Sequence, residues 1–163
     1  QPVNMEETRH CEFKEVKGDN PLWAIKRIVD EYIVAFLNSE GGHIFWGIRD
    51  SDRLVTGVHL TYRQRDAVRK LITDRIFQVQ PAVSPNCYHV HMHPVFEGEK
   101  TRKDLYVVEI AILRPATDLL YFTGSGDVFV KTDAGRKKLS GSEIHDEILR
   151  RLQRGAGIYP LVR

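Results

Sequence analysis

The sequence predicts one α+β domain, a mixed β-sheet with helices packed against it. A length of 163 residues with 42% hydrophobic content suits a single core that needs no disulfides. Apolar residues recur at helical spacing over residues 21–37 and 62–77. Between these segments, short apolar or alternating runs bounded by Gly, Pro, Asn and Asp predict strands. We expect the domain to cover residues 1–157, with 158–163 as a tail or linker.

The first half of the chain is organised around a glycine turn between a helix and a strand. Gly41 and Gly42 can end a helix, and the apolar run after them places Asp50 at a strand exit. An earlier alternating strand puts Glu12 and Lys14 on one face. The expected elements are a strand at 10–16, a helix at 21–37, a strand at 43–48 and its hairpin return strand at 54–58.

The second half is expected to combine two more helices with three strands. These are a helix at 62–77, paired strands at 87–93 and 104–113, a strand at 128–131, a basic loop at 136–138 and a last helix at 142–154. In the last helix, Ile144, Ile148, Leu149 and Leu152 recur at helical spacing, which predicts that they face the core.

Composition limits the classes of function. Cys11 and Cys87 are far apart in sequence, so we expect two thiols in a reducing compartment, with the cytoplasm favoured over the nucleus. No apolar run reaches the roughly 20 residues needed to cross a bilayer, so we expect a soluble protein that makes no membrane contact. The balance of 24 basic and 22 acidic residues does not by itself indicate nucleic-acid binding. The glycine spacing lacks a phosphate-binding loop, which excludes nucleotide-triphosphate hydrolysis there.

Glu7, Glu12 and Asp50, with Lys14, are the first candidates for chemistry. Carboxylates that share a site repel one another unless a cation or a shifted protonation compensates, and oxygen ligands suit Mg²⁺ or Mn²⁺ rather than zinc. Spacing alone does not bring these acids together. Patterning therefore leaves open that they are separate surface acids beside turns.

A second candidate is the row of Cys87, His89, His91 and His93, which would share one face of a strand. These residue types are zinc ligands. Alternate residues on a strand are about 6.6 Å apart, so at most two neighbours could chelate one ion. A solvated polar strand face is the preferred interpretation.

Three basic clusters could contact phosphates, although a merely solvated face is equally open for each. They are Arg63, Arg65, Arg69 and Lys70 in the second helix, Arg136, Lys137 and Lys138 in the basic loop, and Arg150 and Arg151 in the last helix.

Three stretches of the chain resemble the Schlafen proteins and the wider group of AlbA-type Schlafen-like domains. They are Glu-Thr-Arg-His-Cys-Glu-Phe-Lys at 7–14, the segment around Asn-Ser-Glu-Gly-Gly at 35–50, and Val-Thr-Gly at 55–57. The resemblance continues more weakly through residues 128–131, the basic loop and the last helix. It covers nearly the whole chain and implies an AlbA-type Schlafen-like lobe.

In nuclease-competent Schlafens, three carboxylates at the matching positions cut structured RNA such as transfer RNA. The resemblance therefore implies that Glu7, Glu12 and Asp50 hold one or two Mg²⁺ or Mn²⁺ ions, which activate water or the RNA's own 2′-hydroxyl in an endoribonuclease. Lys14 would stabilise charge on the phosphate. One alternative is a non-catalytic RNA-binding or subunit-assembly module. Another is a protein-interaction domain whose acids face solvent.

The chain differs from the Schlafen pattern in two ways, and each difference leads to a further expectation. The Schlafen core has two related lobes and this chain has one, which predicts a homodimer or pairing with another Schlafen-like subunit. In this respect the chain is more similar to animal Schlafen-like complexes that trim small-RNA precursors. The family's zinc positions fall near 85–87 and 116–118, where only Cys87 matches. The resemblance thus gives no support to a structural zinc site.

Overall fold

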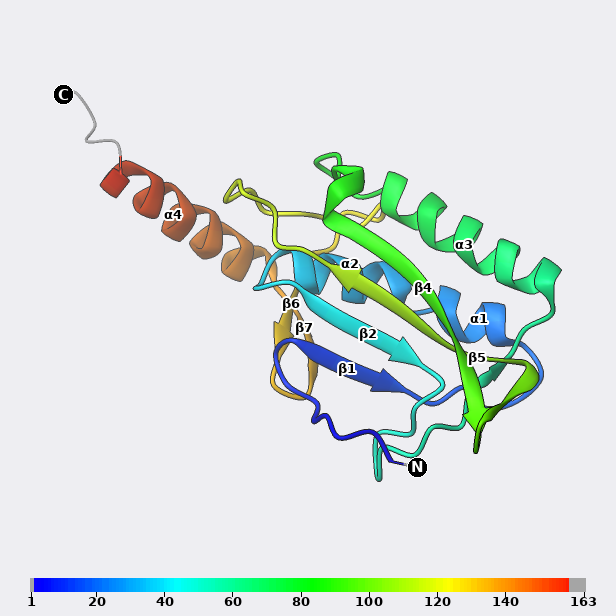
Figure 1. Cartoon of the computed structure of the whole chain (residues 1–163). Helices are drawn as coiled ribbons and strands as arrows, with labels where there is room; N and C mark the ends of the chain where they lie inside the picture. The colour runs from blue at the N-terminus through cyan, green and yellow to red at the C-terminus, as the bar shows by residue number, and fades with distance from the viewer. Residues whose placement is uncertain (1, 159–163) are drawn as a thin grey trace.

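The main layer of the molecule is a five-stranded sheet, described here from a computed structural model that covers residues 2–158, with side chains described as far as Gly155. Strand β1 pairs parallel to β2, and β5 pairs antiparallel with β2, β3 and β4. Strands β1 and β4 therefore form the two edges (Figure 1). The strands are β1 (Cys11–Lys14), β2 (Gly42–Trp46), β3 (Val58–His59), β4 (Tyr88–Glu97) and β5 (Lys100–Ile112).

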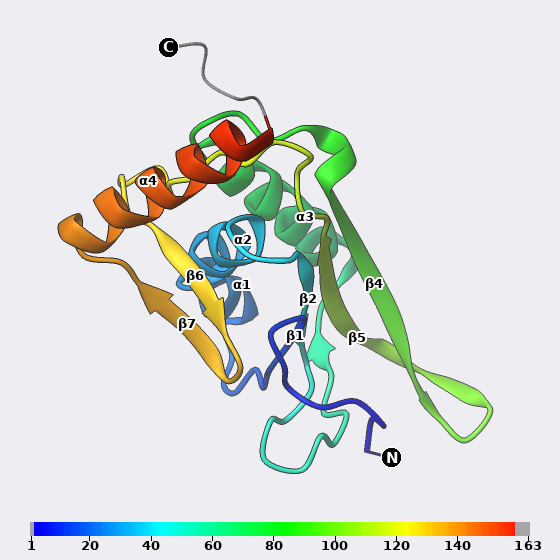
Figure 2. The same cartoon turned by 90° about the vertical axis from the view of Figure 1, so that its left-hand side faces the viewer.

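Helices cover one face of this sheet, and a small hairpin lies beyond them (Figure 2). The helices against the sheet are α1 (Pro21–Lys26), α2 (Val29–Leu37) and α3 (Tyr62–Phe77). The hairpin is β6 (Phe129–Thr132) and β7 (Gly135–Lys138), and α4 (Gly141–Ile158) follows it. Helix α2 lies between sheet and hairpin, so nearly all of its side chains are buried. The predicted class, a mixed sheet with packed helices, is confirmed.

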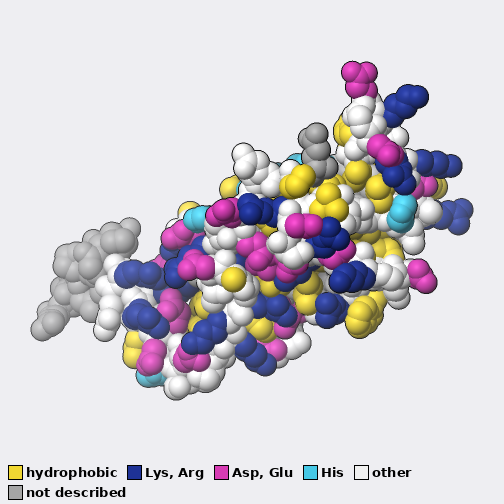
Figure 3. Space-filling model, turned by 90° about the horizontal axis from the view of Figure 1, so that it is seen from below, with side chains coloured by type: hydrophobic (Ala, Val, Ile, Leu, Met, Phe, Trp, Pro, Cys, Tyr) yellow, Lys and Arg dark blue, Asp and Glu magenta, His cyan; other side chains and the backbone are white. Residues whose placement is uncertain are grey.

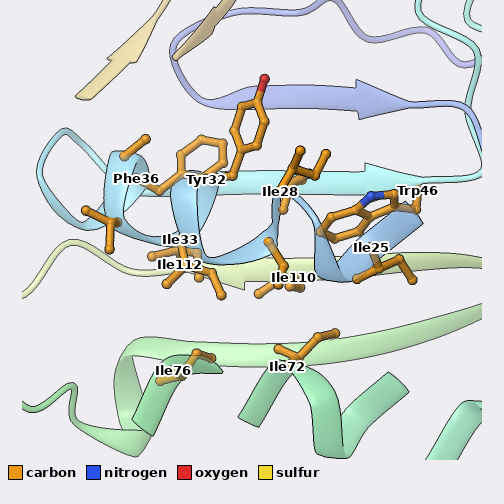
Figure 4. Packing of buried hydrophobic residues seen from close by; sticks show 14 of the residues in the cluster. Ile25, Ile28, Tyr32, Ile33, Phe36, Trp46, Ile72, Ile76, Ile110 and Ile112 are labelled. Atoms are coloured by element: carbon orange, nitrogen blue, oxygen red, sulfur yellow. The ribbon is translucent and has the colours of Figure 1, made fainter. Parts of the chain in front are cut away.

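The core fills the space between the sheet and the helices (Figure 4). Ile44, Trp46 and Ile110 from the sheet are at most 1% exposed. Burying a large apolar side chain contributes roughly 1.5–3 kcal/mol, so this interface dominates stability. The ring of Tyr32 belongs to the same layer, but its hydroxyl extends from α2 toward β1 (Figure 4).

The helix starts follow from local sequence. The side chain of Asn20 accepts a hydrogen bond from Trp23 N at 3.0 Å, and Pro21 takes the first helical position of α1. Helix α3 begins with a reciprocal capping box between Thr61 and Gln64. Its observed bounds equal the predicted 62–77.

The expected continuous helix over residues 21–37 is wrong, because the chain breaks between α1 and α2. Ile28 has φ −132°, outside the helical range. The break redirects the chain while Ile25, Ile28 and Val29 all stay buried. The apolar spacing continues through the break, so periodicity could not reveal it.

The expected return strand at 54–58 is present only in part: Arg49 N donates to Leu54 O and Thr56 N to Gly47 O, so a short hairpin-like pairing follows β2 without a full strand. Val55 makes only an isolated bridge to Ile48, and β3 pairs with β5 instead. Thr56 N and Gly57 N both donate to Gly47 O, and Gly57 has φ +72°. This tight turn directs the chain away from β2.

The predicted basic loop at 136–138 is also wrong, since these residues form strand β7. Strand β7 pairs antiparallel with β6 from Phe129 opposite Lys138 to Thr132 opposite Gly135. Gly135 has φ +133°, a value that glycine adopts readily, and it permits the tight turn between β6 and β7. The basic side chains are thus held on a strand.

The orientation predicted for the last helix is wrong as well. Ile148, Leu149 and Leu152 are 40%, 44% and 64% exposed. The side of α4 that meets the body carries Arg151, whose side chain is only 9% exposed. A polar contact, rather than the apolar stripe, attaches this helix.

Two observations concern the ends and the membrane. Helix α4 extends to Ile158, and residues 159–163 of the predicted tail lie outside the described residues. None of the described helices has both the length and the apolar character needed to span a bilayer.

Candidate active site

Glu12 lies on the helix-covered face of β1 and is 2% exposed. Its Oε1 is 3.0 Å from Lys14 Nζ and accepts a hydrogen bond from the Tyr32 hydroxyl at 3.2 Å. Its Oε2 is 2.9 Å from the ammonium of Lys131, a fully buried side chain. That second contact is an ion pair whose angle does not suit a hydrogen bond. Two cations therefore compensate this carboxylate, and the prediction that Glu12 and Lys14 share a face is confirmed.

The two lysines keep Glu12 ionised. Burial alone would raise the pKa of Glu12, but Lys131 and Lys14 hold the pKa below its ordinary value. Burial would in turn lower the pKa of Lys14, and the Glu12 charge raises it instead. Buried Glu12 is thus paired with one fully buried lysine, Lys131, and one partly exposed lysine, Lys14.

Glu7 lies beside the free edge of β1, where its Oε1 accepts the backbone N–H of Phe13 at 3.1 Å. Burial raises the pKa of Glu7, the Phe13 N–H opposes this, and the charges of Glu12 and Asp50 raise the pKa further. Asp50 is exposed just after β2. Glu7 and Glu12 are thus both held at β1, whereas Asp50, in the part of the chain that the structure describes, makes no contact with either of them that brings the three acids into one cluster.

The Asn-Ser pair before the glycine turn positions the second lysine. The Asn38 amide donates to the carbonyls of Tyr121 and Phe129 at 2.9 and 3.0 Å and accepts Tyr121 N at 2.7 Å. Ser39 Oγ accepts Lys131 N at 3.0 Å. The motif at the end of α2 thereby fixes β6, and with it the lysine that reaches Glu12.

Lys131 and Tyr32 are site residues that sequence reasoning missed. Alternation in the strand puts Lys131 on the same face as buried Phe129, and an inward lysine requires an acidic partner. Tyr32 lies on the apolar stripe of its helix, and a buried tyrosine hydroxyl usually finds a partner. Both signals were present, but neither identifies Glu12 as that partner.

Among the predicted basic residues, those of β7 are nearest to the carboxylates. The guanidinium of Arg136 lies 4.7 Å from the centre of the Tyr32 ring and donates to Glu31 at 2.8 and 3.1 Å. Lys137 and Lys138 each contact a neighbouring carboxylate, at 2.6 and 3.3 Å. Arg136 is thus held next to the site.

The basic set on α3 lies elsewhere, on the side of the helix layer away from β1 (Figures 1 and 2). Arg65 donates to Leu60 O at 2.8 Å and to Asp104 at 3.3 Å, and its guanidinium lies 4.6 Å from the centre of the Tyr106 ring. The structure does not bring this set to the carboxylates. The set is Arg63, Arg65, Arg69 and Lys70.

On α4, Arg150 is 66% exposed and Arg151 is 9% exposed, and both contact Glu147. Seen from below the view of Figure 1, where β1 lies, acidic and basic side chains are interspersed over the surface (Figure 3). Anion recognition must therefore come from local clusters rather than from a broad field of one sign.

The carboxylates fit a divalent metal only in part. Among residues 2–158, no three His, Cys, Asp or Glu side chains come together closely enough to hold a metal ion. Both oxygens of Glu12 already face ammonium groups. Glu7 and Asp50 offer oxygens of the type that Mg²⁺ and Mn²⁺ prefer, and Mg²⁺ often takes one or two carboxylates plus water and phosphate oxygens. Glu7 and Asp50 are therefore the residues that would hold a divalent ion, and Glu12 would contribute only a neighbouring charge.

The histidine row is partly as predicted. A short 3₁₀ turn (Pro85–Cys87) keeps Cys87 out of β4, so its expected place in the strand is wrong. His89, His91 and His93 share one exposed face, with successive ring centres 6.1 and 6.0 Å apart. They form a polar strand face on the side of the sheet opposite the helices.

Comparison with known proteins identifies the family of this chain. The sequence model of the family described as Schlafen, AlbA_2 matches residues 7–140, which include all three carboxylates and Lys131. The fold is similar to the crystal structure of the DIP2311 protein from Corynebacterium diphtheriae, with a TM-score of 0.55 and 20% identity. The similarity covers 89% of this chain and 24% of that one, so this chain spans about a quarter of that protein's length. The chain belongs to the Schlafen AlbA_2 family.

Proposed function

We propose that this domain is a divalent-metal-dependent endoribonuclease acting on structured RNA, such as transfer RNA or a small-RNA precursor. The proposal is supported by the contacts at β1, where Glu7 accepts the Phe13 N–H at the free edge and Glu12 pairs with Lys14, within the part of the chain that matches the family model. Arg136, Lys137 and Lys138 lie on the nearby strand β7 and would contact the RNA backbone. The basic residues of α3 would reach only a longer RNA.

The carboxylates have different roles in this proposal. Glu7 is half-buried and its Oε1 is fixed by the Phe13 N–H at 3.1 Å, which suits a fixed oxygen ligand for a cation. Asp50 is exposed and can approach the substrate. Lys14, 28% exposed, keeps part of its ammonium surface for a phosphate oxygen while it pairs with Glu12.

Glu7 and Asp50 would hold Mg²⁺ or Mn²⁺. When bound, such an ion polarises the phosphodiester and offsets its negative charge. Glu12, already compensated by two lysines, would orient Lys14 rather than bind the ion alone. Burial and, to a smaller extent, the charges of Glu12 and Asp50 raise the pKa of Glu7, and a bound cation would offset both effects.

The test uses labelled transfer RNA with Mg²⁺ or Mn²⁺, and an EDTA arm. We expect Glu7→Gln and Asp50→Asn to slow cleavage by about 100-fold or more, the usual size of the loss of one electrostatic contribution to the transition state. The matched control is Glu6→Gln, because Glu6 is 77% exposed and has only a 3.8 Å contact with Arg53. It should cut at nearly the parental rate.

Cleavage at the parental rate by either site variant would contradict the carboxylate mechanism. Glu12→Gln is a poor first choice, since it leaves buried Lys131 without its acid and can unfold the protein. Glu7 also predicts a pH effect. The wild-type rate should fall in acid, because protonation of this carboxylate competes with its binding of the ion.

A second candidate function is a non-catalytic RNA-binding or subunit-assembly module. It is favoured by the two ammonium groups that occupy Glu12, because a neutralised carboxylate is a weak metal ligand. This candidate predicts RNA binding in EDTA and an unchanged RNA after incubation with Mg²⁺ or Mn²⁺. The same assay therefore separates the two candidates.

We further propose that the domain works with a second Schlafen-like subunit, either another copy or a different chain. The support is the exposed apolar side of α4, where Ile148 and Leu152 border a cavity of about 260 Å³ together with Leu119 and Phe122. Exposed apolar surface of this kind is common at interaction sites. Mass measurement in solution should give more than one chain per particle, and Leu152→Glu should reduce it.

A further inference from the structure

A charged cavity lies between α4, β6 and the turn after α2. Its volume is about 410 Å³. Five basic side chains and two carboxylates line it, so its lining carries an excess of positive charge. The lining residues that bear on anion binding are Arg9, Ser39, Arg114, Lys131, Arg151 and Arg154.

Three arginines at this cavity share a single aspartate. Arg154 lies 3.0 Å from Asp118 Oδ2, and Arg151 and Arg114 lie 3.4 and 3.6 Å from Oδ1. One carboxylate cannot balance three guanidinium groups. Arg151 has a second acid in Glu147, at 3.0 Å, which leaves Arg114 and Arg154 under-compensated. An anion in the cavity would supply the missing negative charge.

Arg151 is the fixed element of this cluster. Its guanidinium donates to Glu147, Asp118, Leu119 O and Asn38 O, and its side chain is 9% exposed. Four of the five N–H donors of an arginine are thereby used. The residue attaches α4 to the body and has little left for a ligand.

The donors available to a ligand belong to the more exposed arginines. Arg9, Arg114 and Arg154 have side chains 64%, 50% and 55% exposed. Each makes ion pairs, but a half-exposed guanidinium can exchange or share such a pair at little cost. Guanidinium groups bind phosphate oxygens in a two-pronged geometry, which makes phosphate the matching anion.

Lys131, whose side chain is fully buried, links the cavity to the candidate active site. Lys131 lines the cavity and also contacts Glu12 at 2.9 Å. Arg9 lies two residues after Glu7 in the segment along the edge of β1. A polyanion with one phosphate at the carboxylates could therefore place another phosphate here.

We propose that this cavity binds a phosphate group of the RNA and sets the position of the backbone relative to the carboxylates. The identity of the ligand as RNA rests on the proposed function, whereas the anion site itself does not. The phosphate could be an internal phosphodiester or a terminal monophosphate, and both place the same charge between Arg114 and Arg154.

The first experiment tests the anion site alone, with inorganic phosphate as the probe. Phosphate should shift the arginine Nε–Hε NMR signals of Arg9, Arg114 and Arg154 in the full chain, compared with chloride at equal ionic strength. In Arg114→Gln/Arg154→Gln the response of Arg9 should be lost. No phosphate-dependent shift in the wild type would overturn the site.

The second experiment measures binding of structured RNA in EDTA, so that cleavage does not interfere. The double variant should bind about 10-fold more weakly at low salt. The slope of the logarithm of the binding constant against the logarithm of the salt concentration should become shallower, by the amount expected for the loss of about one to two phosphate contacts. The control is Lys100→Gln/Arg102→Gln, which removes the same charge from the β4–β5 hairpin tip, far from α4 (Figure 2). Equal binding by variant and control would overturn the RNA assignment.

Oligoribonucleotides with a 5′-phosphate or a 5′-hydroxyl distinguish the two sources of phosphate. A loss limited to the phosphorylated oligonucleotide indicates a terminal group, and an equal loss for both indicates the backbone. If wild type responds to phosphate but binds no RNA, the anion site stands and the proposed function fails. If RNA binding depends on these arginines while Glu7→Gln still cleaves, the positioning site stands and the carboxylate mechanism fails.

Discussion

The two faces of the main sheet each carry a nearly buried glutamate between two side chains that can be positively charged. On the helix-covered face, Glu12 is 2% exposed and lies between Lys14 and Lys131. On the opposite face, Glu109 is 9% exposed, with His43 and His93 at 2.6 and 2.7 Å from its two oxygens. The arrangement is alike, but the partners differ in chemistry and in burial.

That difference separates a permanent ion cluster from a conditional one. The lysines of Glu12 are 28% and 0% exposed, and the Glu12 charge raises the pKa of Lys14 against the effect of burial. The histidines of Glu109 are 48% and 52% exposed and carry charge only when protonated. The first cluster is therefore shielded from solvent, whereas the second is open to it.

The largest expected effect is on the buried cluster. Lys131→Met should reduce the free energy of unfolding by about 3 kcal/mol, because it leaves a buried carboxylate with only one cation. Urea denaturation measures this loss. Lys137→Met is the matched control, since Lys137 is 55% exposed in its pair with Glu143 and should contribute under about 1 kcal/mol.

A double variant sharpens this result. Glu12→Gln/Lys131→Met removes both charges, so it should be more stable than Lys131→Met alone. Should the single variant prove as stable as its control, the two faces would not differ in the way described.

A smaller effect is expected on the open face. Glu109→Gln should cost about 1–2 kcal/mol at pH 7, since it replaces two charge-assisted contacts with half-exposed histidines. Glu99→Gln, in the exposed turn between β4 and β5, is the control. Urea denaturation of both variants and the wild type at pH 7 gives the difference.

The same variants predict a pH dependence. Burial alone would raise the pKa of Glu109, but hydrogen bonds from His93 and His43 and their charges hold the pKa below its ordinary 4.5. Its stabilisation is therefore present above about pH 4.5 and lost as the pH falls through the lowered pKa. The gap between wild type and Glu109→Gln should narrow in acid. A gap that stays constant down to pH 3 would show that the carboxylate charge is not what stabilises this face.

The smallest expected effect concerns the support of the buried cluster. Ser39→Ala removes the acceptor of the Lys131 backbone N–H at 3.0 Å and should cost about 1 kcal/mol. Ser125→Ala, in an exposed turn, is the control and should change little. If thermal unfolding shows no difference between them, the Asn-Ser motif does not hold β6 in the way we describe.

Local sequence predicted the elements well where their signals are local. Helix α3 begins where predicted, because Thr61 and Gln64 cap its N-terminus from within four residues. Pairing of β4 with β5 was also predicted and is confirmed, since a short turn joins two alternating runs. The break at Ile28, the exposed stripe of α4 and the strand β7 were missed, because each depends on what lies against the segment.

The sequence by itself determined the fold class, the facing of Glu12 with Lys14, and the three acids as candidates through their resemblance to a family. Only the tertiary structure decided that Lys131 reaches Glu12 and that three arginines meet at Asp118. Alternation and helical spacing state which side of an element a residue faces. They do not state which distant charge it meets, because that depends on how the hairpin and α4 pack on the helix layer.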